Sequence, residues 1–160
     1  DFTQIDGFDT LPIQTILSEV GLFASRFPTC PHVVSWRCLC PDHRITGGKV
    51  TNSKTRKTKN RAGNAFRLAA QAVGNSTGPL GSFYRRLKSR LDAPTAITAT
   101  AHKLARLFYS LWKDPQSFDL ERLAYHEQQH TLNTISYLRK KAASLGFDLV
   151  PQPVATPEVS

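Results

Sequence analysis

The segment RAGNAFRLAAQAVGNSTGPLGSFYRRL, residues 61–87, contains two runs of helical periodicity separated by a glycine-rich break. In each run the apolar residues recur three and four positions apart, as they do along the buried face of a helix. Gly74 directly follows the first run, where glycine commonly ends a helix. The segment therefore predicts two helices joined by a short turn at 74–78. The apolar positions are Ala62, Ala65, Phe66, Leu68, Ala69, Ala72 and Val73, then Leu80, Phe83, Tyr84, Leu87 and, just past the segment, Leu91.

The same periodicity continues on both sides of this segment, so most of the chain is expected to be helical. Prolines lie in the first turns and glycines follow the last turns, as is typical of helix ends. The further expected helices run from Leu11 to Val20, from Pro31 to about Cys38 with Thr29 as its cap, from Pro94 through Trp112, and from about Asp119 to Leu145.

The region 41–58 has a different character, because it is polar and has no helical period. Gly47 and Gly48 lie between Ile45 and Val50, and such a dipeptide can turn a small β-hairpin. The sequence as a whole thus predicts a compact all-α domain with one irregular basic loop or small hairpin.

A chain of 160 residues fits one domain with a hydrophobic core of its own. We expect residues 1–150 to form this domain and the proline-rich tail 151–160 to be disordered. No stretch approaches the roughly 20 apolar residues of a membrane span. The first residue is Asp1 rather than Met, which indicates a processed product or a piece of a longer protein. The expected parts are a helix-hairpin-helix-like part at about 3–42, a basic loop at 43–60, a serine-bearing helical part at 61–113 and a C-terminal helix at 118–146.

Positive charge is concentrated in the middle of the chain. Residues 43–113 carry fifteen Lys and Arg and a single acidic residue, Asp92, whereas both flanks are mildly acidic. A field of one sign favours a phosphate backbone as partner. A solvated charged loop is the alternative, but ordinary surfaces intersperse the two signs of charge. The cations that we expect to contact nucleic acid are Lys49, Lys54, Arg56, Lys57, Lys59, Arg61, Arg67, Arg85 and Arg86.

Ser76 lies inside this basic region, between two glycines, and has two interpretations. A serine ahead of a new apolar run is most often the N-cap of the next helix, and Thr77 competes for that role. The other interpretation is a nucleophile toward a phosphodiester, because Arg85 and Arg86 follow it and cations stabilise a pentacovalent phosphorus. The local pattern favours the cap, and the sequence shows no carboxylate cluster whose metal would activate the hydroxyl.

The N-terminal segment IDGFDTLPIQTILSEVG, residues 5–21, reads as a glycine turn followed by an amphipathic helix. Half of a helix-hairpin-helix has this arrangement, in which backbone N–H groups at the helix start hold one DNA phosphate. An ordinary turn into a core helix is the more common explanation of so short a pattern. Asp6 and Asp9 also weaken the case for direct phosphate contact.

Two patterns formally resemble metal sites. His126 to His130 reads HEQQH, a match to the zinc motif HExxH, but no suitable third ligand follows it. The cysteines and the next histidine are spaced C-x7-C-x-C-x2-H, which fits no usual zinc site. We therefore expect no metal here, and three buried free thiols in a reducing compartment. The residues of this second pattern are Cys30, Cys38, Cys40 and His43.

Five segments in a fixed order resemble the C-terminal domain of insertion-sequence 110 family transposases, the Piv/MooV-like recombinases. The similarity also reaches LRKKAASLGFDLVP at 138–151, and so runs through essentially the whole chain. The five segments are IDGFDTLPIQTILSEVG at 5–21, SRFPTCPHVVSW at 25–36, ITGGKV with SKTRKTKNRAGNAFRLAAQAV at 45–73, NSTGPLGSFYRRL at 75–87 and AITATAHKLARLFY at 96–109.

This resemblance implies a function in DNA transposition. In the family, the C-terminal domain supplies a serine nucleophile, and counting back from Leu80 carries that role over to Ser76. A separate N-terminal RuvC-like domain binds Mg²⁺ through four acidic residues. The resemblance thus implies that this chain binds no cofactor itself, that the Mg²⁺ comes from that missing domain, and that the chain alone does not cleave DNA.

The implied partners are DNA, a structured noncoding bridge RNA, the RuvC-like domain and other protomers of the same transposase, with no membrane. The implied location is the bacterial cytoplasm, associated with the nucleoid. A non-catalytic remnant that binds nucleic acid and has lost the chemistry is the alternative.

Overall fold

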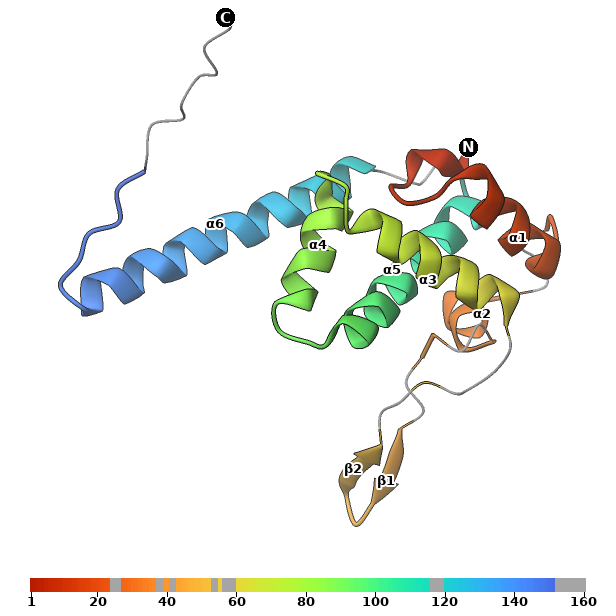
Figure 1. Ribbon diagram of the computed structural model, residues 1–160, viewed down its shortest axis with the longest axis horizontal. Helices are drawn as coiled ribbons and strands as arrows, with labels where there is room; N and C mark the ends of the chain where they lie inside the picture. Colours follow the sequence, from red (N-terminus) through yellow and green to blue (C-terminus); the bar gives the residue numbers. More distant parts are fainter. Residues whose placement is uncertain are drawn as a thin grey trace, which may run out of the picture.

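The computed structural model describes residues 1–23, 27–36, 39–40, 43–52, 55, 60–115 and 120–151. Helices dominate it, and a two-stranded hairpin is the only sheet among these residues, which confirms the predicted mostly α-helical class (Figure 1). The expected disordered tail lies almost wholly outside the described residues. The elements are η1 (Phe2–Gln4), α1 (Thr10–Val20), α2 (Cys30–Trp36), β1 (Arg44–Thr46), β2 (Lys49–Asn52), α3 (Arg61–Val73), α4 (Pro79–Lys88), α5 (Ala93–Lys113) and α6 (Leu120–Ser144).

Polar side chains fix where several helices begin. Asp9 and Asp92 stand ahead of α1 and α5, and their carboxylates accept hydrogen bonds from the backbone N–H groups of Thr10 and Thr95. These caps start both helices one residue earlier than the apolar period alone predicts. Asn60 caps α3 through Gly63 N–H and also donates to the carbonyl of Trp36, which ties the end of α2 to the start of α3.

The core is built around α3, which packs against α1 on one side and α5 on the other (Figure 1). Helix α2 packs on α5, and α4 lies against both α3 and α5. Phe66 of α3 and Phe108 of α5 are fully buried and meet edge to face, with their ring centroids 5.7 Å apart. Phe8, from the turn before α1, contacts both rings. This aromatic cluster fixes the N-terminal turn onto the helical body.

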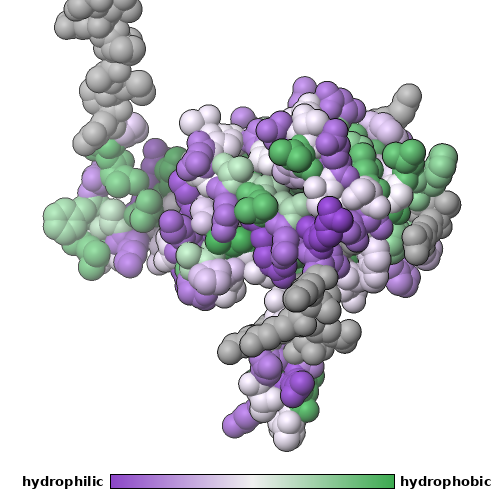
Figure 2. Space-filling model, turned by 45° about the vertical axis from the view of Figure 1, so that its right-hand side comes forward, coloured by the Kyte–Doolittle hydropathy of each residue, from purple (hydrophilic) through white to green (hydrophobic). Residues whose placement is uncertain are grey.

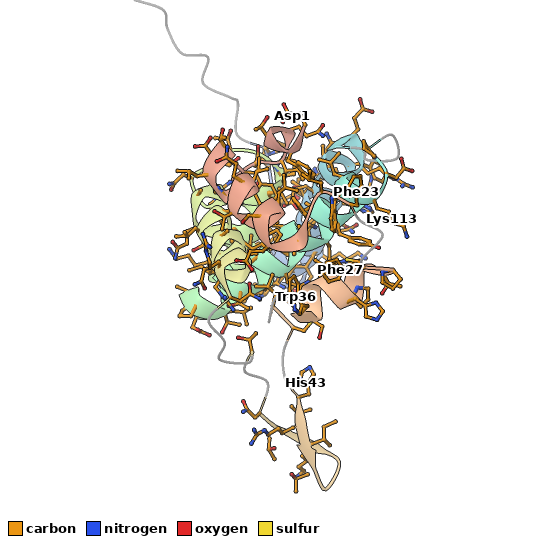
Figure 3. The ribbon with its side chains drawn as sticks, turned by 90° about the vertical axis from the view of Figure 1, so that its right-hand side faces the viewer. Asp1, Phe23, Phe27, Trp36, His43 and Lys113 are labelled. Atoms are coloured by element: carbon orange, nitrogen blue, oxygen red, sulfur yellow. The ribbon has the colours of Figure 1, made fainter. Side chains whose placement is uncertain are left out.

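A second set of contacts holds the α2 region on α5. The ring of Phe27 lies 5.2 Å from that of Trp36, at the side of the body from which the hairpin segment with His43 extends (Figure 3). The buried hydroxyl of Tyr109 donates to the carbonyl of Phe27, 2.9 Å away. The segment between α1 and α2 is thereby tied to α5.

The predicted hairpin is present at 44–52. Strands β1 and β2 pair in antiparallel fashion, and the turn residues Gly47 and Gly48 have φ angles of 57° and 76°. Two positive φ angles in succession are what a tight hairpin turn requires, and glycine adopts them without steric cost. Both strands are largely exposed and extend away from the helices (Figure 1).

Helix α6 packs on α4 near its beginning and then leaves the body of the domain (Figure 1). Figure 2 shows hydrophobic side chains gathered at its far end. Leu145 and Phe147 there are 67 % and 70 % exposed. Among the described helices, none combines the length and the apolar character that crossing a membrane would require.

Candidate functional site around Ser76

Ser76 lies in the short turn between α3 and α4 and is half-buried. Its hydroxyl donates a hydrogen bond to Asp6 Oδ2 over 2.7 Å, and its Oγ accepts one from the backbone N–H of Gly78 over 3.0 Å. Asp6 precedes Ser76 by 70 residues. The serine is therefore held by a carboxylate from a distant part of the chain.

The prediction that Ser76 or Thr77 caps the next helix is wrong. Helix α4 begins at Pro79 with Gly78 as its N-cap, and no described side chain caps its first turn. An N-cap side chain would accept from an N–H group inside that turn, whereas Ser76 accepts from Gly78, ahead of it. Pro79 at the first helical position has no N–H to satisfy, which reduces the need for a cap. The hydroxyl is thus available for another role.

Asp6 reaches Ser76 because its neighbours in the sequence are anchored in the core. Ile5 is fully buried and Phe8 is 6 % exposed. Gly7 between them has a φ of 87° and lies so close to α3 that an added Cβ would come under 3.0 Å from Ala69 O. The carboxylate of Asp6 is then the polar side chain that this turn presents to the α3–α4 turn.

This turn belongs to the segment 5–21, whose sequence resembles half of a helix-hairpin-helix. In the structure the contacts described for it are with the protein itself: Gly7 faces α3 and Asp6 faces Ser76.

Glycines around Ser76 make room for these contacts. A Cβ on Gly78 would come under 3.0 Å from Asp6 Oδ2, and one on Gly81 would collide with the carbonyl of Ser76. Gly74 has an ordinary right-handed φ of −56°, so it does not end α3 through a left-handed conformation. Its Cβ would instead approach the ring of Tyr84. At each of these three positions a neighbouring group lies too close for a Cβ, which explains why glycine occurs there.

Arg85 is the predicted phosphate-contacting residue that the structure brings to Ser76. Its guanidinium donates to the carbonyl of Ser76 over 2.7 Å and to that of Gly74 over 3.2 Å, while the residue remains exposed. A guanidinium has five N–H donors, so Arg85 can hold this turn and still present N–H groups to an anion. It is the cation best placed to stabilise charge near the Ser76 hydroxyl.

The other described cations of the predicted set lie elsewhere. Arg86 pairs with Glu127 of α6 and lies over the ring of Phe83. Arg61 is at the start of α3, about 18 Å along that helix from the end near Ser76 at 1.5 Å per residue. Arg67 donates to Asn64 one turn before it. These side chains do not converge with Arg85 on one point.

The predicted basic loop is described only in part. Lys49 lies exposed on β2. The other loop cations that we predicted to contact nucleic acid fall outside the described residues. They are Lys54, Arg56, Lys57 and Lys59.

Arg86 also contacts the HEQQH motif at 126–130. Its glutamate, Glu127, forms the ion pair with Arg86 and so helps to hold α6 against α4. Burial, reinforced by the neighbouring charge of Arg86, lowers the pKa of Lys103 beside this pair. No group of three His, Cys, Asp or Glu able to hold a metal ion occurs in the part of the chain that the structure describes.

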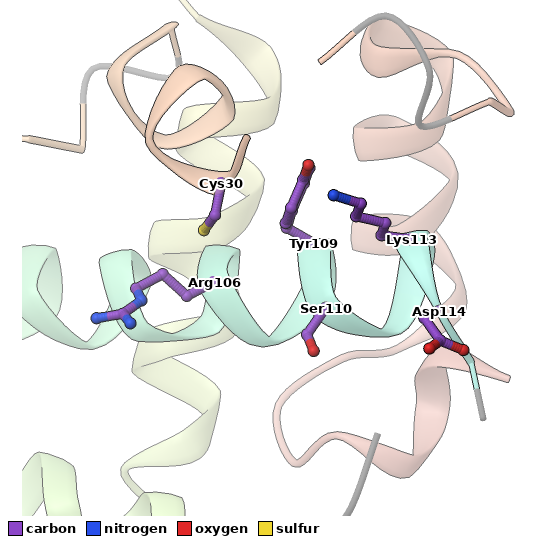
Figure 4. Close-up of a pocket in the computed structure, with 6 residues that line it drawn as sticks. All are labelled: Cys30, Arg106, Tyr109, Ser110, Lys113 and Asp114. Atoms are coloured by element: carbon purple, nitrogen blue, oxygen red, sulfur yellow. The ribbon is translucent and has the colours of Figure 1, made fainter. Parts of the chain in front are cut away.

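In the part of the chain that the structure describes, cavities lie beside the helices near the Ser76 turn and along α5. One, of about 520 Å³, opens beside the Ser76 turn between the start of α4 and α6. The other, of about 640 Å³, lies along α5 next to the start of α2 (Figure 4). Its side chains come from Cys30 and from one end of α5, including Arg106 and Lys113. It shares no lining residue with the contacts of Ser76.

The cysteines differ from the expectation of buried thiols. Cys30 and Cys40 are free, as predicted, but only half-buried, and Cys38 lies outside the described residues. Burial raises the pKa of both thiols. Both thiols therefore stay protonated at neutral pH and are weak nucleophiles. Ser76 is therefore a stronger candidate for a nucleophile than either of these two cysteines.

Comparison with known proteins identifies the class as a transposase. The family model described as "Transposase IS116/IS110/IS902 family" matches residues 1–85, a stretch that contains both Asp6 and Ser76. Since this is more than half of the chain, the chain belongs to that family. DNA transposition is therefore its general function, and DNA is its partner. No curated protein and no solved structure matches the chain.

Proposed function

We propose that this chain supplies the serine nucleophile, Ser76, of a DNA recombinase. The observation that carries the proposal is the hydrogen-bonded setting of its hydroxyl: half-buried, held by Asp6, and beside the exposed guanidinium of Arg85. A serine that serves only as a surface residue or a cap does not need a carboxylate from 70 residues away. Membership of a transposase family supports a phosphodiester as the bond that it attacks.

The proposed reaction is a transfer of the phosphoryl group between oxygens. Ser76 Oγ forms a bond to the phosphorus while the bond from phosphorus to one DNA oxygen breaks, and that oxygen leaves with a proton. The phosphoserine link conserves the energy of the phosphodiester, so a DNA hydroxyl can reverse the step and rejoin the strands. Arg85 stabilises the negative charge that builds up on the phosphate oxygens.

The proposal includes partners that this chain does not contain. A RuvC-like domain is proposed to bind Mg²⁺, which neutralises phosphate charge, and a bridge RNA to pair with both DNA partners. Other protomers are proposed to complete the site, and the basic loop at 43–60 to contact DNA or RNA phosphates. We place this assembly at the bacterial nucleoid.

The test is formation of a covalent protein–DNA adduct that survives denaturation. The chain is combined with a family RuvC-like domain, guide RNA and a fluorescent DNA duplex carrying the end of the element. We expect Ser76→Ala to abolish the adduct and the matched control Thr77→Ala, which removes the adjacent hydroxyl, to leave it. An undiminished adduct with Ser76→Ala would refute the proposal. DNA binding that weakens steeply with salt and never yields an adduct would identify the non-catalytic alternative.

A further inference from the structure

We propose that Asp6 is the proton acceptor for Ser76, so that the chain carries the activating base of its own nucleophile; this rests on the function proposed above. The sequence shows no activator near Ser76, and it gives Asp6 no role beyond weakening the case for phosphate contact. The fold places the carboxylate of Asp6 at the Ser76 hydroxyl, 2.7 Å away.

The hydrogen bonds at Ser76 leave its oxygen oriented for attack. A hydroxyl has one proton to donate and two lone pairs to accept with. The proton is directed at Asp6 Oδ2, and one lone pair accepts from the N–H of Gly78. The second lone pair is the one that forms a bond to phosphorus. Asp6 therefore both fixes the rotation of the hydroxyl and stands where the proton must go.

The position of Asp6 is fixed on both sides of the hydrogen bond. On its own side, Ile5 and Phe8 are buried and Gly7 lies against α3. On the other side, Gly78 leaves the space that the carboxylate occupies, since a Cβ there would come under 3.0 Å from Oδ2. A carboxylate held so closely keeps its geometry as the substrate arrives, which favours catalysis over a mobile surface group.

The proton balance of the step is simple. As Ser76 Oγ bonds to phosphorus, its proton passes to Asp6 Oδ2, and the departing DNA oxygen takes a proton from solvent. On rejoining, the attacking DNA hydroxyl gives its proton to solvent, and Ser76 leaves as a hydroxyl that regains its proton from Asp6. An aspartate takes a hydroxyl proton in the same manner in kinases, where the bond to phosphorus is also formed by an alcohol.

The test is the single-turnover rate of adduct formation with Asp6→Asn, in the same assembly of chain, metal-binding domain, guide RNA and fluorescent DNA. Asparagine has nearly the same shape and its amide oxygen still accepts from Ser76, but it cannot take the proton. At saturating DNA we expect the rate to fall about 100-fold or more, the range of a general base, while DNA affinity is unchanged. Asp9→Asn is the matched control: Asp9 is exposed, caps α1 and is expected to keep the parental rate.

A second variant, Gly78→Ala, keeps both side chains of the pair and crowds the carboxylate most, because its Cβ would come under 3.0 Å from Asp6 Oδ2 and lie 3.2 Å from Ser76 Oγ. We expect it too to lower the adduct rate more than tenfold at unchanged DNA affinity. An adduct rate within about threefold of the parent for Asp6→Asn, folded by circular dichroism, would overturn the role of Asp6, and so would a parental rate for folded Gly78→Ala. If Ser76→Ala still forms the adduct, the proposed function itself fails; if Ser76→Ala abolishes it and Asp6→Asn does not slow it, only the role of Asp6 fails.

Discussion

Replacing Gly7 by alanine should destabilise the domain more than replacing any glycine in open surroundings. Gly7 has a φ of 87°, a conformation that costs an alanine about 1–2 kcal/mol. Its new Cβ would also collide with Val73 Cγ2 and with the backbone oxygen of Ala69. Overpacking of this kind costs about 1–3 kcal/mol. The two terms together predict a loss of about 2–5 kcal/mol in the free energy of unfolding.

Gly21→Ala is the matched control for this variant. Gly21 has a φ of 85°, but nothing lies within 4 Å of a Cβ added there. Its substitution should lower the free energy of unfolding only by the cost of the positive φ angle, about 1–2 kcal/mol. Urea denaturation followed by circular dichroism measures both variants, and their difference isolates the contact between the N-terminal turn and α3. Equal losses for Gly7→Ala and Gly21→Ala would refute the docking of this turn on α3, and with it the placement of Asp6.

Three further predictions concern the packing and the charges. Phe108→Ala should lower the free energy of unfolding by about 3–5 kcal/mol, because the ring is fully buried in the aromatic cluster; a loss below 1 kcal/mol in urea denaturation would contradict that packing. A double-mutant cycle of Arg86→Ala and Glu127→Ala should give a coupling of about 1 kcal/mol, since both side chains are three-quarters buried; strictly additive effects would argue that the pair does not hold α6. Hydrogen bonding by Thr95 lowers the pKa of Asp92 below its ordinary value of 3.8, so the stability it contributes is present above that value and lost as pH falls below it. Asp92→Asn keeps the cap without titrating, and the parent should therefore lose stability relative to it as pH falls below about 3.8; parallel pH curves would refute the cap.

Local rules predict the elements of this fold well because the features that set them are local. The apolar spacing of residues 61–73 and 80–91 predicts two helices, and the structure confirms both as α3 and α4. Most of the predicted apolar positions are buried or half-buried, but Leu68 and Ala72 of α3 are exposed and Leu91 lies past the end of α4. The hairpin follows from Gly47 and Gly48 alone. Three helices begin one position earlier than predicted: α1, α2 and α5. For α1 and α5 the reason is that the Asp9 and Asp92 caps were not part of the periodic pattern.

The site could not be predicted in the same way, because it depends on contacts between distant parts of the chain. Within a window around Ser76, capping is the common role of a serine, and nothing there indicates Asp6. The signal that could have found the pair is the alternation in IDGF: an acidic residue between two strongly apolar ones beside a glycine. Such a residue is carried to the core surface wherever Ile5 and Phe8 are buried.

The cations illustrate the same limit. The sequence groups Arg85 and Arg86 as neighbours, yet one holds the carbonyl of Ser76 and the other pairs with Glu127. Adjacent positions on a helix point about 100° apart, so consecutive arginines contact different partners. Net charge predicts the class of ligand, whereas the fold decides which cation meets it.

The measurement that tests the central claim most directly is tandem mass spectrometry of the trapped protein–DNA adduct. After nuclease and trypsin digestion, the peptide Leu68–Arg85 should carry the mass of a nucleotide remnant. It contains three aliphatic hydroxyl residues, Ser76, Thr77 and Ser82. We predict that the fragment ions place the remnant on Ser76. A remnant on Thr77, on Ser82 or on another peptide would contradict the assignment of Ser76 as the nucleophile.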